Sequence, residues 1–172
     1  MLRNIVKPVC LMMILLASVL LAACSTPETP TADPNLAWQV NLSKYEVKDK
    51  LDIVVTVKEY MGTTQETHQQ APSAGNVYLI MDVSVNKQGT QTTPFEWDQL
   101  TVQDASGKSY PRLPNDSFLE QFNYTPRMTG LELKIGANEG WVCYEIPAGA
   151  ADGKLSLVYS GTGSQQEITI KN

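Results

Sequence analysis

Apolar and polar residues alternate one by one along most of the chain after residue 36. A strand with one buried face gives this pattern, because successive side chains point to opposite sides of a sheet. The pattern predicts strands over 36–42, 51–57, 77–85, 131–135, 142–146, 155–159 and 168–170. The Asp-Ala-Ser-Gly sequence at 104–107 predicts a hairpin that joins 100–102 to 109–110. No stretch of comparable length has helical periodicity, so the chain is expected to be all-β, a single antiparallel β-sandwich.

Two long segments interrupt the alternation. Residues 61–76 are polar and rich in Thr and Gln, and we expect them to form a loop. Residues 111–127 contain the sequence Ser-Phe-Leu-Glu at 117–120, which fits a capping box. Phe118, Leu119 and Phe122 would share one helical face. We therefore predict one or two helical turns here, lying across a sheet edge.

The N-terminal segment has the layout of an export signal. Arg3 and Lys7 precede an apolar run over 9–23, which is short for a membrane-spanning helix of roughly 20 residues. The run ends Leu21-Ala22-Ala23-Cys24, which resembles a bacterial lipobox, where the cysteine receives a diacylglycerol and the chain is cut before it. Two acyl chains suffice for stable anchoring, whereas one does not. We predict Cys24 as a lipidation site; the alternatives are an ordinary cleavage site beside an incidental cysteine and an uncleaved membrane helix.

The predicted organisation has three parts. Residues 1–23 would form the lipoprotein signal peptide, and residues 24–35 a disordered tether. The tether sequence STPETPTADPN has three prolines and no aromatic residue, which is typical of an extended, solvated linker. Residues 36–172 would form one sandwich domain, because this length is enough for a single core.

Charge and cysteine content narrow the possible partners. The formal net charge is −5, and it becomes about −7 if the signal peptide leaves with Arg3 and Lys7. An acidic body speaks against nucleic acid as a partner and against a domain lying flat on an anionic membrane. If Cys10 leaves with the signal peptide and Cys24 is acylated, Cys143 has no disulfide partner, so the core alone must stabilise the fold.

No catalytic or metal-binding constellation stands out in the sequence. His68 is the only histidine, so a nucleophile with its base and a zinc site both lack the required companions. Cys143 is expected to be a covered, unreactive thiol on a strand. The carboxylates at predicted turns are Asp98, Asp104, Asp116 and Asp152. Turn formation explains them, with a calcium site as the alternative. We expect no metal, no cofactor and no enzymatic activity.

Aromatic residues gather between residues 94 and 126. Phe95 and Trp97 are two positions apart, which favours a place in the core. Phe118, Phe122 and Tyr124 fall in the segment predicted to leave the sheet. Aromatic residues dominate both interface hot spots and ordinary cores. If this segment is exposed, these three residues are the candidate contacts for a partner.

The order of segments after residue 74 resembles a known family. It runs GNVYLIMDVSVN at 75–86, then LTVQD at 100–104 with Gly107 and Tyr110, then GWVCYEIP at 140–147 after an Ile-Gly pair at 135–136. This order is similar to the telokin-like family of uncharacterised bacterial lipoproteins and secreted proteins, over about residues 51–159. The resemblance implies an immunoglobulin-like β-sandwich outside the cytoplasm, and it offers no catalytic residues to transfer.

These features together predict a lipid-anchored protein on the extracytoplasmic side of the cell membrane, or on the outer membrane if there are two. The expected role is a non-enzymatic binding and display module for a protein or envelope ligand, built on a monomeric domain. An inhibitor or accessory protein of an envelope enzyme is the first alternative, and an extracytoplasmic hydrolase is the second. Loops on a rigid scaffold would carry the recognition.

Overall fold

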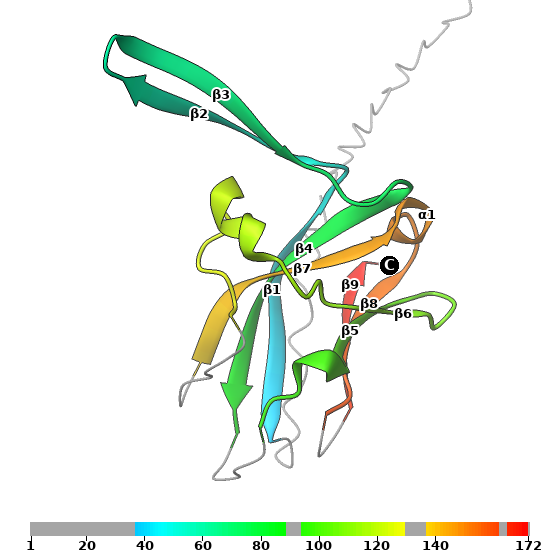
Figure 1. Ribbon diagram of the computed structural model, residues 1–172. Helices are drawn as coiled ribbons and strands as arrows, with labels where there is room; N and C mark the ends of the chain where they lie inside the picture. The colour runs from blue at the N-terminus through cyan, green and yellow to red at the C-terminus, as the bar shows by residue number, and fades with distance from the viewer. Residues whose placement is uncertain (1–36, 89–93, 130–136, 162–164, 172) are drawn as a thin grey trace, which may run out of the picture.

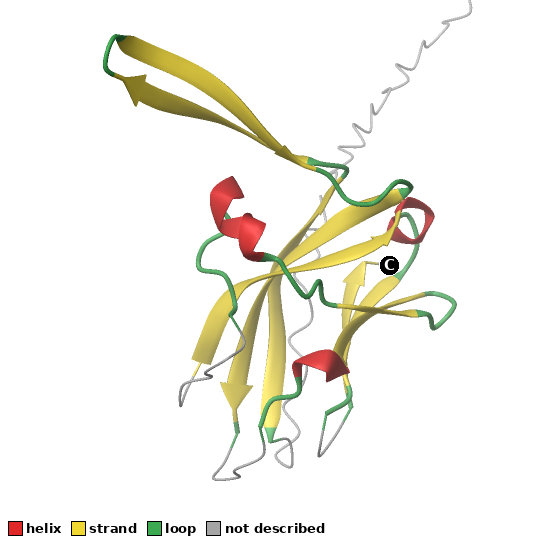
Figure 2. Cartoon of the chain, viewed as in Figure 1, coloured by secondary structure: helices red, strands yellow, loops and turns green. Residues whose placement is uncertain are grey.

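A computed structural model describes residues 37–88, 94–129, 137–161 and 165–171, and strands dominate them (Figure 2). The elements are β1 (Trp38–Lys48), β2 (Leu51–Glu59), β3 (Gly62–Gln70), β4 (Asn76–Lys87), η1 (Trp97–Gln99), β5 (Leu100–Asp104), β6 (Ser109–Pro111), η2 (Ser117–Phe122), β7 (Ala137–Pro147), α1 (Ala148–Ala151), β8 (Leu155–Tyr159) and β9 (Gln166–Lys171). The predicted signal peptide, the lipobox, the tether and the strand predicted over 131–135 lie outside the described residues.

Two antiparallel sheets pack face to face around one core (Figure 1). One sheet has the strand order β1-β4-β7 and the other has the order β6-β5-β8-β9. Alternate residues of both sheets supply the core, among them Val40, Leu79, Tyr144, Leu100 and Leu157. The prediction of an all-β antiparallel sandwich is confirmed. The strands predicted over 77–85, 142–146, 155–159 and 168–170 are present, as is the hairpin around 104–107.

Two buried polar side chains tie the sheets together. The Gln166 side chain on β9 accepts a hydrogen bond from the Val40 N–H at 3.0 Å and donates one to the Trp38 carbonyl at 2.6 Å. It thereby satisfies backbone groups of β1 as a neighbouring strand would. On the other side of the core, the Tyr144 hydroxyl of β7 donates to the Leu100 carbonyl of β5 at 3.1 Å. Both contacts fix the sheets in one relative position.

Strands β2 and β3 form a separate two-stranded ribbon, residues 51–70, which we call the arm. It extends away from the sandwich (Figure 1), and its turn is the pair Tyr60-Met61, because Glu59 and Gly62 are register partners. The loop predicted over 61–76 is therefore wrong: residues 62–70 are a strand. The polar Thr and Gln residues give no apolar alternation, yet β2 offers them a complete partner strand, and Thr favours extended structure.

The outer face of the sheet β1-β4-β7 is covered by residues 112–128, which we call the strap. Its helical part is the 3-10 helix η2, whose Leu119 is buried among Tyr78, Ile80, Trp141 and Cys143 of the sheet. The helical turns are thus confirmed. Their predicted place across a sheet edge is wrong: the helical turns lie over the sheet's outer face, and the strap contacts the edge of β7 through residues on either side of them.

The predicted capping box at 117–120 is wrong. The residue before η2 is Asp116, and no side chain caps the helix by hydrogen bonding. Ser117 Oγ instead donates to Asn115 Oδ1 at 2.8 Å. The helix ends at Asn123, whose φ of 68° lies in the left-handed region that Asn tolerates.

The strap also closes the free edge of β7. The Leu113 N–H donates to the Cys143 carbonyl at 2.9 Å, the Met128 N–H to the Trp141 carbonyl at 3.0 Å, and the Trp141 N–H to the Pro126 carbonyl at 2.9 Å. This close approach requires glycine at position 140. A Cβ there would lie 2.8 Å from Met128 N and 3.0 Å from the Pro126 carbonyl oxygen.

Candidate functional site

The three aromatic residues predicted as contacts are half-buried and serve the strap. Phe118 packs on Tyr78 with ring centroids 5.4 Å apart, and Tyr124 meets Trp141 edge-on at 4.9 Å. Phe122 packs against the same cluster. Phe95 and Trp97 pack on the main core, as expected from their spacing. The structure thus brings Phe118, Phe122 and Tyr124 together, but much of their surface covers the sheet.

The Tyr124 hydroxyl is held by an acidic neighbour. It donates to Glu46 Oε2 on β1 at 3.0 Å. Burial first, and then the Glu46 carboxylate, raise the pKa of Tyr124 to about 12. Hydrogen bonding from Lys48 lowers the pKa of Glu46, with a smaller contribution from Tyr124. The phenol therefore stays protonated at neutral pH and acts as a fixed donor between the strap and β1.

A buried ionic cluster holds the strap closed. The Asp116 carboxylate is almost fully buried and accepts from Arg112 at 2.9 Å and from Arg127 at 3.0 Å. Arg112 also donates to the Met128 carbonyl, and Arg127 reaches Glu120 at 3.4 Å. The cluster joins both ends of the strap through one carboxylate. The sequence reasoning missed this role, since it placed Asp116 among turn carboxylates.

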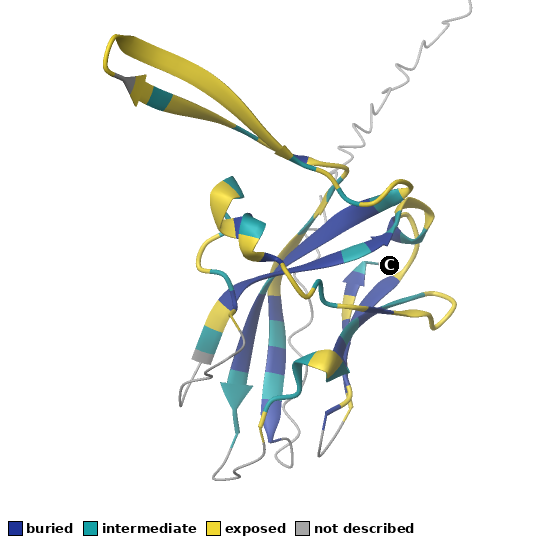
Figure 3. Ribbon diagram, viewed as in Figure 1, coloured by how far each residue is buried: buried dark blue, intermediate teal, exposed yellow. Residues whose placement is uncertain are grey.

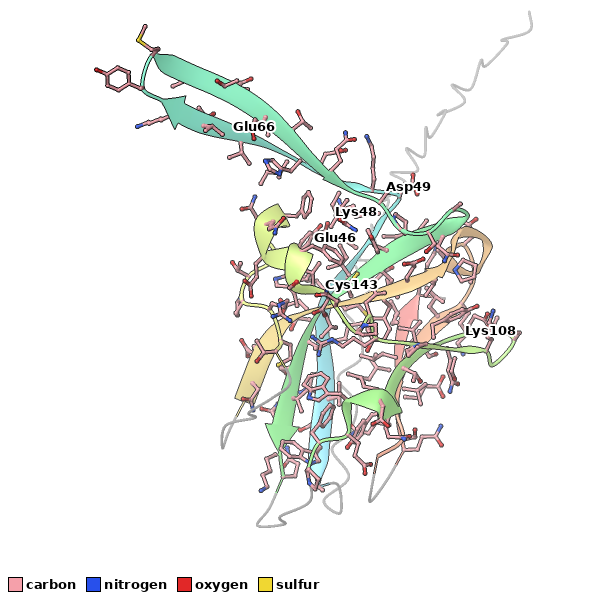
Figure 4. The ribbon with its side chains drawn as sticks, in the orientation of Figure 1. Glu46, Lys48, Asp49, Glu66, Lys108 and Cys143 are labelled. Atoms are coloured by element: carbon pink, nitrogen blue, oxygen red, sulfur yellow. The ribbon has the colours of Figure 1, made fainter. Side chains whose placement is uncertain are left out.

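Cys143 and His68, for which the sequence predicts no catalytic or metal-binding role, lie on strands β7 and β3. Cys143 is fully buried beneath the strap (Figure 4), and burial raises its pKa well above the ordinary thiol value. The expectation of a covered thiol is confirmed, and the thiol stays protonated at neutral pH. His68 lies exposed on β3, 3.6 Å from Glu66, and not in a loop. Among the described residues, no group of three or more His, Cys, Asp and Glu could hold a metal ion.

Asp104 shows the turn chemistry expected of it. Its Oδ1 accepts from the Ser106 hydroxyl at 2.6 Å, and its Oδ2 accepts from the Tyr110 hydroxyl at 2.8 Å. Hydrogen bonds from the side chains of Ser106 and Tyr110, in that order, lower the pKa of Asp104 to about 2. This carboxylate organises the β5–β6 hairpin.

The arm is the most exposed apolar element of the described residues (Figure 3). Tyr60 and Met61 at its tip are 101% and 91% exposed, and Val54 and Val55 on β2 are 59% and 38% exposed. Strand β3, with the sequence GTTQETHQQ, has no apolar side chain. The arm meets the sandwich at its base, where Leu51 is buried in the cluster beneath η2. Its sequence signal was present in part, as the β-branched run over 53–57.

The arrangement defines a class of protein: a β-sandwich with a strapped outer face and a projecting hairpin. None of the helices in the described parts of the chain is long and apolar enough to cross a membrane. Residues 45–168 match the family described as a domain of unknown function (DUF4352), and the chain belongs to this family.

Two solved structures are similar to this chain. A conserved hypothetical protein from Bacillus anthracis shares 20% identity at a TM-score of 0.49, covering 78% of this chain and 88% of its own. An uncharacterised β-sandwich protein from Clostridium difficile 630 shares 13% identity at a TM-score of 0.41, covering 78% of this chain and 86% of its own. No curated protein matches the sequence.

Proposed function

We propose that this protein is a lipid-anchored, non-enzymatic binding module on the extracytoplasmic side of the cell membrane, and that the arm is its recognition element. In this proposal Cys24 carries the lipid, residues 24–35 act as a tether, and the sandwich is of the immunoglobulin-like, telokin-like type. The tether would give the folded body reach, and the membrane would raise the local concentration for weak contacts.

The observation that carries the proposal is the exposure of the arm. An isolated two-stranded ribbon is only marginally stable in water, and the apolar side chains at the tip bury nothing in the sandwich. Tyr and Met are side chains that interfaces favour. A strand with five consecutive β-branched residues, 53–57, and one edge that no described strand covers invites pairing with another chain. A partner that covers the arm removes these costs.

A capture experiment tests the arm as the recognition element. The full chain is immobilised and exposed to an envelope extract from the source bacterium, beside the double variant Tyr60→Ala/Met61→Ala. The matched control is Thr64→Ala/Gln65→Ala, which changes two exposed polar residues of the same arm. We expect one or more species to be captured by the wild type and by the control and to be lost with the tip variant. Equal capture by all three baits contradicts the proposal.

A second variant tests the three strap residues that the sequence predicted as partner contacts, for comparison with the tip of the arm. The triple variant Phe118→Ala/Phe122→Ala/Tyr124→Ala removes the aromatic cover, and it is read together with an unfolding curve. We expect this variant to lose stability, whereas the tip variant keeps its stability and loses the partner. Loss of the partner at unchanged stability in the strap variant would move the recognition site to the strap.

The anchor has its own test. Mass spectrometry of the protein purified from membranes should find a diacylglycerol-modified Cys24 as the first residue, and Cys24→Ala should release the chain from washed membranes. An unmodified Cys24, or a Cys24→Ala chain that stays bound as firmly, rules the anchor out.

The second candidate function is an inhibitor or accessory protein of an envelope enzyme. The narrow tip favours it, because Tyr60 and Met61 project from a two-residue turn that could enter a cleft. If the species captured through the tip is a hydrolase or transferase, its activity with and without the full chain decides between simple binding and inhibition.

A further inference from the structure

We infer that the outer edge of β2 is a self-association surface: β2 pairs antiparallel with β2 of a second copy, and the two-fold axis passes between the two Val55 residues. The inference rests on the proposed function, in which the arm is the binding element. It adds that a second copy of this chain binds to the arm. It replaces the expectation of a monomeric domain with a weak, membrane-concentrated dimer.

One edge of β2 has backbone N–H and C=O groups that are free to pair with another strand. Glu59 and Gly62 flank a two-residue turn, so this pair exchanges both hydrogen bonds, and every second residue of β2 from Glu59 back to Leu51 does the same with β3. The even-numbered residues, from Asp52 to Lys58, therefore direct their N–H and C=O groups away from β3. No strand of the described residues pairs with them. Figure 1 shows the outer half of the arm clear of the sandwich.

The sequence of β2 is self-complementary along that edge. When two copies of β2 pair antiparallel about Val55, even-numbered residues lie opposite even-numbered residues. This alignment is the one needed, because the even-numbered residues direct their N–H and C=O groups outward. Val54 then faces the partner's Thr56, and Ile53 faces the partner's Val57. Val55 faces its own copy as a non-hydrogen-bonded pair, where side chains approach most closely. Cross-strand pairs of β-branched residues stabilise a sheet.

Charge complementarity selects this register. The same alignment places Asp52 opposite the partner's Lys58, and Lys58 opposite the partner's Asp52, so the symmetric dimer has two opposite-charge pairs at its ends. Shifting the register by two residues in either direction breaks both pairs. Asp52 is bound to Lys50 at 3.2 Å on the surface. Such an exposed pair is weak and leaves the carboxylate able to accept a second cation.

The opposite edge of the arm lacks these features. Strand β3 has no apolar residue, and its titratable side chains are Glu66 and His68, which lie 3.6 Å apart. Self-pairing through β3 would therefore bury no apolar side chain. The difference between the two edges of one ribbon supplies matched controls, because every position on β2 has a register partner on β3.

Cysteine cross-linking tests the pairing in the full chain. Val55→Cys and its register partner Glu66→Cys are expressed with the native N-terminal segment, and isolated membranes are oxidised mildly and run on non-reducing gels. In the dimer the Cα atoms of the two residues at position 55 would be about 4.5 Å apart, within disulfide reach. The two residues at position 66 would be separated by three strand spacings of about 4.8 Å. We expect a covalent dimer from Val55→Cys at least about tenfold above that from Glu66→Cys.

Charge reversal in the Val55→Cys chain tests the register. Asp52→Lys alone and Lys58→Asp alone should each lower the dimer yield roughly threefold, and the double reversal should restore it. Equal cross-linking of Val55→Cys and Glu66→Cys overturns the inference, and so do single reversals that lower the yield without restoration by the double reversal.

Proline variants give a readout that needs no cysteine. Thr56→Pro removes an outward N–H of β2, and Gln65→Pro, its register partner, removes an outward N–H of β3. In sedimentation velocity of the detergent-solubilised full chain, Thr56→Pro should abolish the dimer and Gln65→Pro should keep it. Dimer loss in both, or in neither, contradicts pairing through β2.

The outcomes for the proposed function and for this inference can be told apart. Partner capture that depends on Tyr60 and Met61, without cross-linking at Val55, would support the proposed function and refute the dimer. Cross-linking at Val55 without tip-dependent capture would support the dimer and refute the proposed function.

Discussion

Strands β2 and β4 each contain a run of mostly apolar residues, but the two runs have opposite surroundings. Residues 77–81 of β4 read VYLIM and are all buried, whereas residues 53–57 of β2 read IVVTV and are half-buried or exposed (Figure 3). Strand β4 lies between β1 and β7, with the second sheet on one face and the strap on the other. Among the described strands, β2 is paired with β3 alone. An apolar strand sequence therefore indicates that the strand can be buried, but it does not show what buries it. The covering residues come from elsewhere in the chain or from another molecule.

The largest expected difference is between core truncations in the two strands. Ile80→Ala removes a fully buried side chain from the outer face of β4 and should lower the free energy of unfolding by about 4 kcal/mol. Val54→Ala on β2 should change it by less than about 0.5 kcal/mol. Urea unfolding of both variants measures this. Similar losses in the two would mean that the arm belongs to the core.

The next effect concerns the ionic cluster that closes the strap. Asp116→Ala leaves Arg112 and Arg127 mostly buried without their carboxylate and should cost about 3 kcal/mol. Glu120→Ala removes only an exposed partner of Arg127 and is expected to cost about 0.5 kcal/mol or less. Unfolding curves that show equal losses would contradict the assignment of Asp116 as the anchor of the strap.

A smaller effect is expected from the close approach of the strap to β7. Gly140→Ala places a methyl group 2.8 Å from Met128 N and should destabilise the fold by about 2 kcal/mol. Gly149→Ala is the control, because nothing lies within 4 Å of its Cβ. A Gly140→Ala chain as stable as the Gly149→Ala chain would show that the strap can move away from β7 at no cost.

The smallest effect is local and depends on pH. Asp104 has a pKa of about 2 in the folded chain against an ordinary value of 3.8. Its contribution is therefore fully present above the ordinary value and is lost as the pH falls through about 2. Hydrogen exchange at the Ser106 and Lys108 amides, which donate to Asp104, should be faster in Asp104→Asn than in the wild type at neutral pH. The difference should shrink as the pH falls from 3.8 to about 2, and a difference independent of pH would exclude the carboxylate as its cause.

The sandwich could be predicted because its strands obey simple alternation, and prediction failed where a segment's role depends on distant residues. Residues 62–70 carry no apolar signal, so their polar composition predicted a loop where β3 stands. The strap's helix was found from Phe118, Leu119 and Phe122, but its closure depends on Arg112 and Arg127 converging on Asp116, which no local spacing shows.

The candidate site was harder to predict for the same reason. The aromatic residues of the strap were expected to be available, because simple alternation leaves one face of each strand in solvent. The apolar Tyr78 and Ile80 on the outer face of β4 were a local sign that this face needs a cover, and the prediction did not use it. The tip residues Tyr60 and Met61 carry no distinguishing signal, since a short turn after a regular strand resembles any other hairpin. Their exposure arises because the described part of the chain covers the arm only at its base, which is a property of the fold.

Removing the arm tests most directly that the arm serves binding and not the core. Leu51 and Gln70 are register partners that exchange hydrogen bonds, so an Asn-Gly turn can replace residues 52–69 and close the ribbon at its base. The account predicts a chain with an unchanged cooperative unfolding transition in urea that captures no tip-dependent partner from the envelope extract. Retained capture, or loss of the cooperative transition, would contradict it.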